Sequence, residues 1–322
     1  MAHEVNGRIA TIRPSWHGLD NILTEEESRD LEVIIRKGNL DYEIKKALIR
    51  YDYNGMERDY PGQFVAYNSK TGAALGTVSR LWRTPQPREC VEFYKELVED
   101  QGWYIETAGS LKQGAAYWCM ANNGITGTIG KNDRAEGRVY IATGIGMPTI
   151  VDNTLVNIVC FNTLSYALRN SSRSGTAVRV IHKTDFDADA VKAQLGLIDY
   201  QEEFNQLIEI GNEATKFSVS DDWVKEYVAK VITPGDEIKD EDGNFLKPRL
   251  VNKVSGYFND SPGSNLPERE GTLWGAINAV TYWTDHERTR NDDARGVELL
   301  YGTSRTIKAK ALDLAMEYME AA

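Results

Sequence analysis

The chain lacks the features that mark several large classes of protein. Only three cysteines occur among its 322 residues, and Cys90, Cys119 and Cys160 are widely spaced among apolar neighbours. This pattern disfavours a disulfide framework and a zinc site, so we expect buried thiols in a reducing compartment. No apolar run approaches the roughly 20 residues of a membrane-spanning helix. Residues Met1 to Leu19 also lack the apolar core of a secretory signal. We therefore expect a cytoplasmic protein without a membrane partner.

Recognisable motifs of catalysis are missing as well. The sequence contains no P-loop, no H-E-x-x-H zinc motif and no G-x-S-x-G nucleophile elbow. Gly144-Ile145-Gly146 begins like a dinucleotide fingerprint but has no third glycine in register. Asp185, Asp187 and Asp189 precede an expected helix, where carboxylates more often complement the helix dipole than hold a metal. These absences favour a binding protein over an enzyme, and we predict neither a cofactor nor a metal.

The acidic charge is concentrated in one block of the sequence. The net charge is −11, from 48 acidic and 37 basic residues. Residues Asp185 to Asp242 hold 16 acidic and five basic residues, so this block accounts for the whole excess. Just before it, residues Leu168 to Thr184 contain four Lys or Arg residues, one histidine and no acid. Because exposed charges are screened beyond about 10 Å, this local basic stripe matters more to a polyanion than the net charge does.

The expected fold class is α+β, with a β-rich N-terminal half and a helical C-terminal third. Alternation and turn residues predict a meander of three strands at Trp103 to Leu111, Ala115 to Ala121 and Arg138 to Gly144. Leu155 to Leu168 is a long apolar run in which Cys160, Leu164 and Leu168 follow a spacing of four, so its latter part is predicted to be a buried helix, although its β-branched start also suits a strand. The core is therefore predicted to be a meander followed by a helix, in the order βββα.

Turn and loop signals divide the chain further. The turn-rich stretch Asn68 to Gly72 separates two strand-like segments and predicts a β-hairpin. We predict a mixed α+β domain with an antiparallel sheet over residues 1–184, and a mostly helical region over residues 185–322 that packs on it. Residues 233–248 are acidic and rich in Pro and Gly, so we expect a mobile loop there.

The basic stripe is the strongest candidate for binding an anion. Its cationic members are Arg169, Arg173, Arg179, His182 and Lys183. Guanidinium groups and the small hydroxyl residues between them can hold a phosphate backbone, and Tyr166 just before them could stack on a base. The alternative is a solvated loop whose arginines pair with the acidic helices that follow.

Two other segments combine cations with aromatic rings or with a helix start. Arg80, Trp82 and Arg83 lie between a predicted strand and a predicted helix. Interleaved cations and rings suit a groove for a single strand, because stacking contributes about 1–3 kcal/mol per base. Arg305 and Lys308 give the last helix a basic start that could contact a polyanion. The alternatives are a tryptophan in the core beside ordinary surface arginines, and helix charges that serve solubility.

Several sequence blocks occur in a distinctive order. They are Pro14 to Leu19, Glu106 to Leu111, Val159 to Leu164, Leu273 to Thr281 followed by Asp285-His286, and Leu300 to Gly302. In this order they resemble the phage/plasmid-like family known as domain of unknown function 932, found on phages, prophages and conjugative plasmids. The resemblance covers nearly the whole chain and implies a protein of the bacterial host cytoplasm. The resemblance does not imply an activity or an active site for this chain.

A weaker likeness is topological. Three meandering strands followed by a helix form the core of the Rad52-like single-strand annealing proteins, although short βββα runs occur in unrelated folds. Together with the basic and aromatic segments, this makes our leading hypothesis a homo-oligomeric protein that binds single-stranded DNA and anneals strands in recombination. Two alternatives stay open. One is an anti-defence or host-interaction protein with no nucleic-acid role. The other is a metal-dependent enzyme acting on nucleic acids or nucleotides, which would need His17, His182 and His286, or the Asp185 run, to converge in one cleft.

Overall fold

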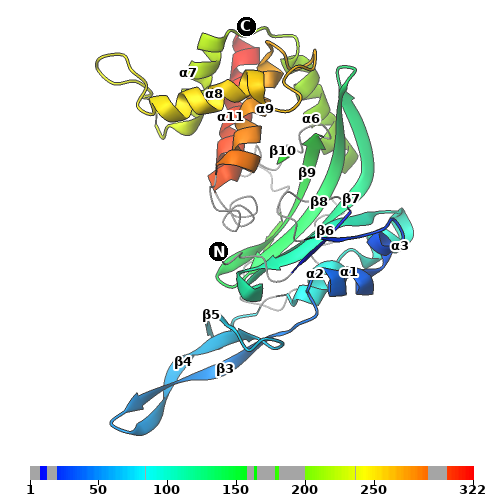
Figure 1. Ribbon diagram of the computed structural model, residues 1–322, viewed down its shortest axis with the longest axis vertical. Helices are drawn as coiled ribbons and strands as arrows, with labels where there is room; N and C mark the ends of the chain where they lie inside the picture. The colour runs from blue at the N-terminus through cyan, green and yellow to red at the C-terminus, as the bar shows by residue number, and fades with distance from the viewer. Residues whose placement is uncertain are drawn as a thin grey trace.

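A computed structural model describes the chain over residues 8–12, 20–83, 85–157, 163–164, 178–180, 200–235, 237–288 and 303–322. Over these residues the fold is mixed α+β, as predicted, with most strands in the N-terminal half and helices in the last third (Figure 1). The division into two domains at residue 184 stays a prediction.

The largest sheet is built on an antiparallel meander. Its strands are β1 (Ile9–Thr11), β2 (Asp20–Ile22), β6 (Tyr104–Leu111), β7 (Ala116–Ile129), β8 (Asp133–Gly144), β9 (Met147–Asn157), β10 (Thr163–Leu164) and β11 (Val178–Val180). Their order is β10-β9-β8-β7-β6-β1-β2, and β11 also pairs with β9. The three predicted meander strands are therefore present, and β9 adds a fourth.

β9 corrects the prediction of a helix after the third strand. Residues Leu155 to Asn157 belong to β9, which agrees with the strand that the β-branched start allowed. Thr163 and Leu164 form β10, so the helix was wrongly predicted at these two positions, and the rest of its predicted range lies outside the described residues. The β-branched residues of β9 favour an extended chain because their side chains fit a pleated sheet. A spacing of four also keeps side chains on one face of a strand, so that signal could not separate the two structures.

A second sheet projects away from the first. Its order is β3 (Ile44–Tyr53), β4 (Met56–Asn68) and β5 (Ala74–Ser79). The predicted hairpin around Asn68 to Gly72 is the β4–β5 pair and is confirmed. β3 was not predicted. It joins β4 through Asn54-Gly55, whose φ angles of 53° and 79° fit the two-residue turn that an Asn-Gly pair favours.

One hydrophobic core lies between the main sheet and three short helices. These are α1 (Leu31–Lys37), α2 (Pro87–Glu92) and α3 (Lys95–Gln101). Tyr94, fully buried between α2 and α3, donates its hydroxyl to the carbonyls of Cys119 and Val139 at 3.1 and 2.9 Å. Cys90 and Cys119 are buried free thiols, as expected, and burial raises the pKa of each. Cys160 lies outside the described residues.

A second core joins the far ends of the meander strands to the C-terminal helices. These are α6 (Tyr200–Ala214), α7 (Asp221–Ile232), α8 (Pro248–Asp260), α9 (Leu273–Tyr282) and α11 (Thr303–Ala321), with a π-helical turn (Trp283–Glu287) extending α9. Ser220 caps α7 by accepting from the backbone N–H of Trp223 at 3.3 Å. Between α7 and α8, an isolated bridge pairs Lys239 with Phe245. None of the described helices combines the length and apolar character that crossing a bilayer requires.

Buried polar groups fasten the β7–β8 turn to the helices. The Asp133 carboxylate accepts from Arg269 Nε and Nη2, both at 2.7 Å, and from Trp274 Nε1 at 2.8 Å. Glu268 Oε1 accepts from the backbone N–H groups of Lys131 and Asn132 at 2.8 and 3.1 Å. Burial alone would raise the pKa of Glu268, but these hydrogen bonds outweigh burial and lower it. These contacts therefore hold the β7–β8 turn against the C-terminal helices.

Candidate nucleic-acid interface

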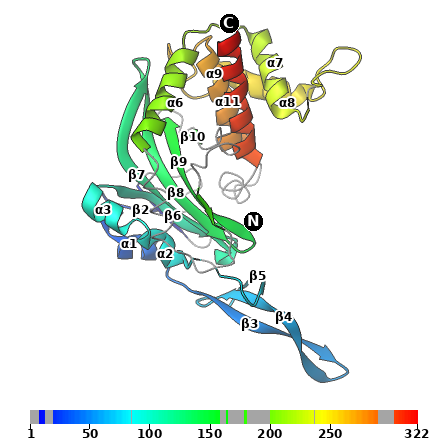
Figure 2. The same cartoon turned by 180° about the vertical axis from the view of Figure 1, so that it is seen from behind.

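The free end of the β3–β4 hairpin is the most exposed regular structure in the described part of the chain. We call residues 50–60, beyond the irregular register at Leu48 and Arg50, the ribbon. β5 pairs with β4 only from Gln63 to Tyr67, so the ribbon has two strands and no sheet neighbour. All of its residues are exposed. It projects from one end of the molecule, and α7, α8, α9 and α11 lie at the other (Figures 1 and 2).

One face of the ribbon carries aromatic rings and a cation. Tyr51 lies opposite Arg58, and Tyr53 lies opposite Met56. Tyr51, Tyr53 and Met56 are 46%, 54% and 54% exposed, and the Arg58 guanidinium carbon lies 5.1 Å from the centroid of the Tyr53 ring. Alternation along β4 places Tyr60, 46% exposed, on the same face. Large rings held open to solvent on a rigid strand are a typical surface for stacking.

The opposite face of the ribbon carries its acids. Asp52 lies opposite Glu57, and Arg50 lies opposite Asp59. Arg50 is held by Asp59 Oδ1 at 3.1 Å and by Glu57 Oε2 at 3.3 Å. The pleat thus separates two surfaces of different chemistry, because side chains alternate along each strand. The aromatic face has Arg58 and no carboxylate, so it presents nothing that would repel a phosphate.

The predicted segment with Arg80, Trp82 and Arg83 lies at the root of the ribbon. Ser79, the residue before it, pairs with Gln63, where the third strand ends and the free ribbon starts. The Lys46 ammonium on β3 donates to the carbonyls of Arg80 and Trp82 at 3.0 and 3.1 Å, which fixes the segment against the hairpin.

The side chains of this segment point to different surroundings. Trp82 packs against the first core and is partly buried, whereas Arg80 and Arg83 are exposed. Leu81 between them is 75% exposed. The structure therefore places two predicted cations beside the ribbon and puts the tryptophan partly into the core.

The cations predicted at the start of the last helix have acidic partners. Arg305 Nη2 lies 2.8 Å from Asp152 Oδ2 on β9, and Lys308 Nζ lies 2.7 Å from Asp285 Oδ1 in the π-helical turn. Lys308 is 6% exposed and Asp152 is fully buried. These pairs attach α11 to the sheet and to the end of α9, so the interface we propose does not include them.

A related ion pair crosses the sheet. Arg138 on β8 is 1% exposed and contacts both Glu106 on β6 and Glu136, with Nη2 at 2.9 and 2.7 Å from their carboxylate oxygens. Glu106, Trp274 and Asp285 all belong to the sequence blocks that carry the family resemblance, and each forms a buried polar contact. The chemistry of these blocks therefore includes interactions that hold the fold together.

The basic stripe falls largely outside the described residues. Tyr166, Arg169, Arg173, His182 and Lys183 are not described, and Arg179 is described only as the middle residue of β11, where it pairs with Ile150. His17 and the Asp185 run are not described either. Within the described ranges, no group of three or more His, Cys, Asp or Glu residues is placed to hold a metal.

The ribbon was missed at the sequence level, although it carries a local signal. Asn54-Gly55 is a strong indicator of a two-residue hairpin turn when strands flank it. The segment before the turn also alternates between aromatic and charged residues, from Arg50 to Tyr53, which is a second local signal of a strand.

The architecture defines a protein with an exposed β-ribbon at one end and a helical subdomain at the other. Comparison with protein families matches residues 74–312 to the family described as Domain of unknown function (DUF932). The chain belongs to this family, which confirms the resemblance seen in the sequence blocks. Searches of curated proteins and of solved structures found no match. The matched region includes the main sheet from β6 onward and most of the helical part, and β1, β2 and the ribbon lie before it.

Proposed function

We propose that the protein binds single-stranded nucleic acid, with unpaired bases stacking on the aromatic face of the ribbon. The observation that carries this proposal is the separation of the two faces: rings with Arg58 on one, and every carboxylate of the ribbon on the other. Stacking on exposed rings accepts any base, and the guanidinium of Arg58 meets the phosphate backbone. Arg80 and Arg83 extend the cationic surface toward the root of the ribbon.

Stacking explains why a single strand is the preferred form. In a duplex the faces of the bases are covered by their neighbours, so tyrosine rings can reach them only after unstacking, which costs a few kcal/mol per step, on the order of the energy gained. A single strand offers its bases freely. Bases held by their faces also keep their pairing edges open, which is the property that strand annealing requires. We extend this proposal to a homo-oligomer that anneals complementary strands in a phage or plasmid context.

The test is fluorescence anisotropy of a labelled oligothymidine, with wild-type protein and variants of the two faces. Losing a stacked ring costs about 1–3 kcal/mol, and about 1.4 kcal/mol is tenfold in affinity. Tyr51→Ser with Tyr53→Ser should therefore weaken binding about tenfold or more. Arg58→Ala should weaken it and reduce the slope of log affinity against log salt by about 0.7.

Arg50→Ala is the matched control, because it removes the same cation from the opposite face of the same ribbon. It should leave the affinity unchanged. Equal losses for Arg50→Ala and Arg58→Ala would mean diffuse attraction between charges and would refute the assigned face. No binding by the wild type at low salt would overturn the function and favour a protein partner instead.

A further inference from the structure

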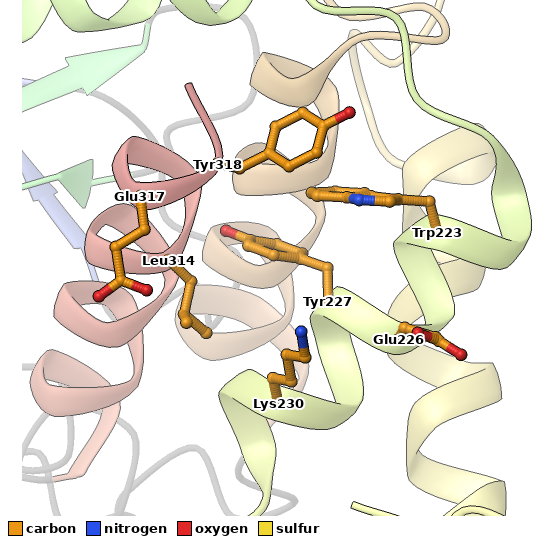
Figure 3. A pocket seen from close by; sticks show the side chains of 7 residues that line it. All are labelled: Trp223, Glu226, Tyr227, Lys230, Leu314, Glu317 and Tyr318. Atoms are coloured by element: carbon orange, nitrogen blue, oxygen red, sulfur yellow. The ribbon is translucent and has the colours of Figure 1, made fainter. Parts of the chain in front are cut away.

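A pocket opens between α7 and α11, at the opposite end of the molecule from the ribbon (Figures 1 and 3). Its volume is about 230 Å³. It is lined by Trp223, Glu226, Tyr227, Lys230, Leu314, Glu317 and Tyr318. Aromatic rings from both helices form one wall, and three charged side chains stand around them (Figure 3).

The aromatic wall is continuous and held in place. The Trp223 ring stacks on Tyr227 with centroids 5.2 Å apart and planes at 14°, and it meets Tyr318 at 4.7 Å and 56°. The Tyr227 hydroxyl donates to the carbonyl of Ala311 at 2.7 Å, which fixes that ring against α11. The faces of such rings carry partial negative charge and attract cations, most often the guanidinium of arginine.

The carboxylates of the pocket differ in how far they are neutralised. Glu226 pairs with Lys239 at 2.7 Å, and that contact, assisted by the nearby charge of Lys230, lowers the pKa of Glu226. Lys230 lies four residues after Glu226 on the same helix and is the cation among the residues that line the pocket. Among the residues that the structure describes, none forms an ion pair with Glu317. Glu317 is therefore the lining carboxylate that no ion pair neutralises in the described part of the chain.

The position of Glu317 in its helix is also electrostatically unfavourable. It lies near the C-terminal end of α11, where the helix dipole favours cations and no basic residue occupies the last turn. Asp313 and Glu320 lie four residues before and three residues after it, so its neighbours on the helix face are acidic. Residues 200–322 hold 23 acidic and 14 basic residues, a net charge of −9. Each of these facts favours a positively charged ligand.

We propose that this pocket binds an arginine side chain from a basic segment of a partner protein. The planar guanidinium can stack on the partly exposed ring of Tyr318 while it donates two hydrogen bonds to the Glu317 carboxylate. A lysine ammonium has neither a plane that stacks nor the paired donors of a bidentate contact, so the pocket prefers arginine. The same negative field repels nucleic acid, which makes this site independent of the function proposed for the ribbon.

The test is anisotropy of a labelled triarginine peptide with blocked ends, compared with peptides in which lysine or neutral citrulline replaces arginine. Wild-type protein should bind the arginine peptide most tightly. Glu317→Gln should weaken that binding about tenfold or more, because charge-assisted hydrogen bonds are roughly twice as strong as neutral ones and two of them are affected. Glu320→Gln removes an equal charge from the same helix outside the pocket and should change affinity less than about twofold.

Both glutamates are exposed, so the variants should melt at the wild-type temperature. Equal weakening by Glu317→Gln and Glu320→Gln would show general attraction to an acidic helix and would overturn the proposal. Equal binding of the citrulline peptide, or no binding of the arginine peptide, would do the same. Oligothymidine binding is unaffected by Glu317→Gln if the two sites are independent, so failure at one site is distinguishable from failure at the other.

Discussion

Replacing Asp133 by asparagine should destabilise the protein more than any exposed substitution. Asp133 is fully buried and Arg269 is 1% exposed, and three hydrogen bonds at 2.7–2.8 Å converge on the carboxylate. Asparagine keeps one acceptor oxygen but leaves the Arg269 charge without a counter-charge. Removing one partner of a buried ion pair costs about 3–5 kcal/mol. Since total stability is about 5–15 kcal/mol, a large part of it would be lost.

The assay is equilibrium unfolding in urea, followed by tryptophan fluorescence. Arg50→Ala is the comparison, because Arg50 forms its ion pairs, at 3.1 and 3.3 Å, on an exposed surface, where such pairs contribute less than about 1 kcal/mol. The pair Asp133→Asn with Arg269→Gln should lose less than the sum of the single losses, since each variant removes the same interaction. A loss below about 1 kcal/mol for Asp133→Asn would refute the reasoning that this buried pair fastens the β7–β8 turn to the helices.

Two further substitutions, Gly275→Ala and Glu268→Gln, probe the same region. Gly275→Ala would place a Cβ 2.0 Å from the Arg269 carbonyl oxygen, so we expect a loss of about 3 kcal/mol in urea unfolding. Gly256→Ala in α8 meets nothing within 4 Å and should stabilise the helix slightly, and equal effects would contradict this steric account. Glu268→Gln should cost about 1 kcal/mol at neutral pH, because hydrogen bonds to a charged acceptor are stronger. The folded pKa of Glu268 is lowered, so its contribution is present above the unfolded value of about 4.3 and disappears as the pH falls through the folded pKa. Unfolding curves measured from neutral to acidic pH should therefore converge for the two proteins, and a constant difference would exclude a role for the charge.

Sequence patterns predicted the elements whose signals are local. The turn residues at Asn68 to Gly72 located the β4–β5 hairpin, and alternation located β6, β7 and β8. α8 was missed because it follows a segment rich in Pro and Gly, although Pro248 at its start suits a first helical position. The end of β9, from Leu155 to Asn157, was ambiguous because an apolar run buried on both faces has no period that distinguishes strand from helix.

The candidate sites depend on contacts that sequence patterns do not contain. The charges of Arg305 and Lys308 are visible in the sequence, but their partners Asp152 and Asp285 are distant along the chain. A basic residue that binds a phosphate and one that joins a helix to a sheet look alike until the fold is known. The aromatic wall of Trp223, Tyr227 and Tyr318 likewise forms only when α7 packs on α11.

The ribbon can change without disturbing the rest of the protein. None of its residues is buried, it belongs to neither core, and it precedes the region that the family shares. Leu48 and Phe64 lie directly opposite each other where it begins, so a short turn could replace everything beyond them. Selection that preserves the two cores therefore places little constraint on the amino-acid sequence of the ribbon. Relatives can diversify this appendage in length and composition while keeping the same scaffold.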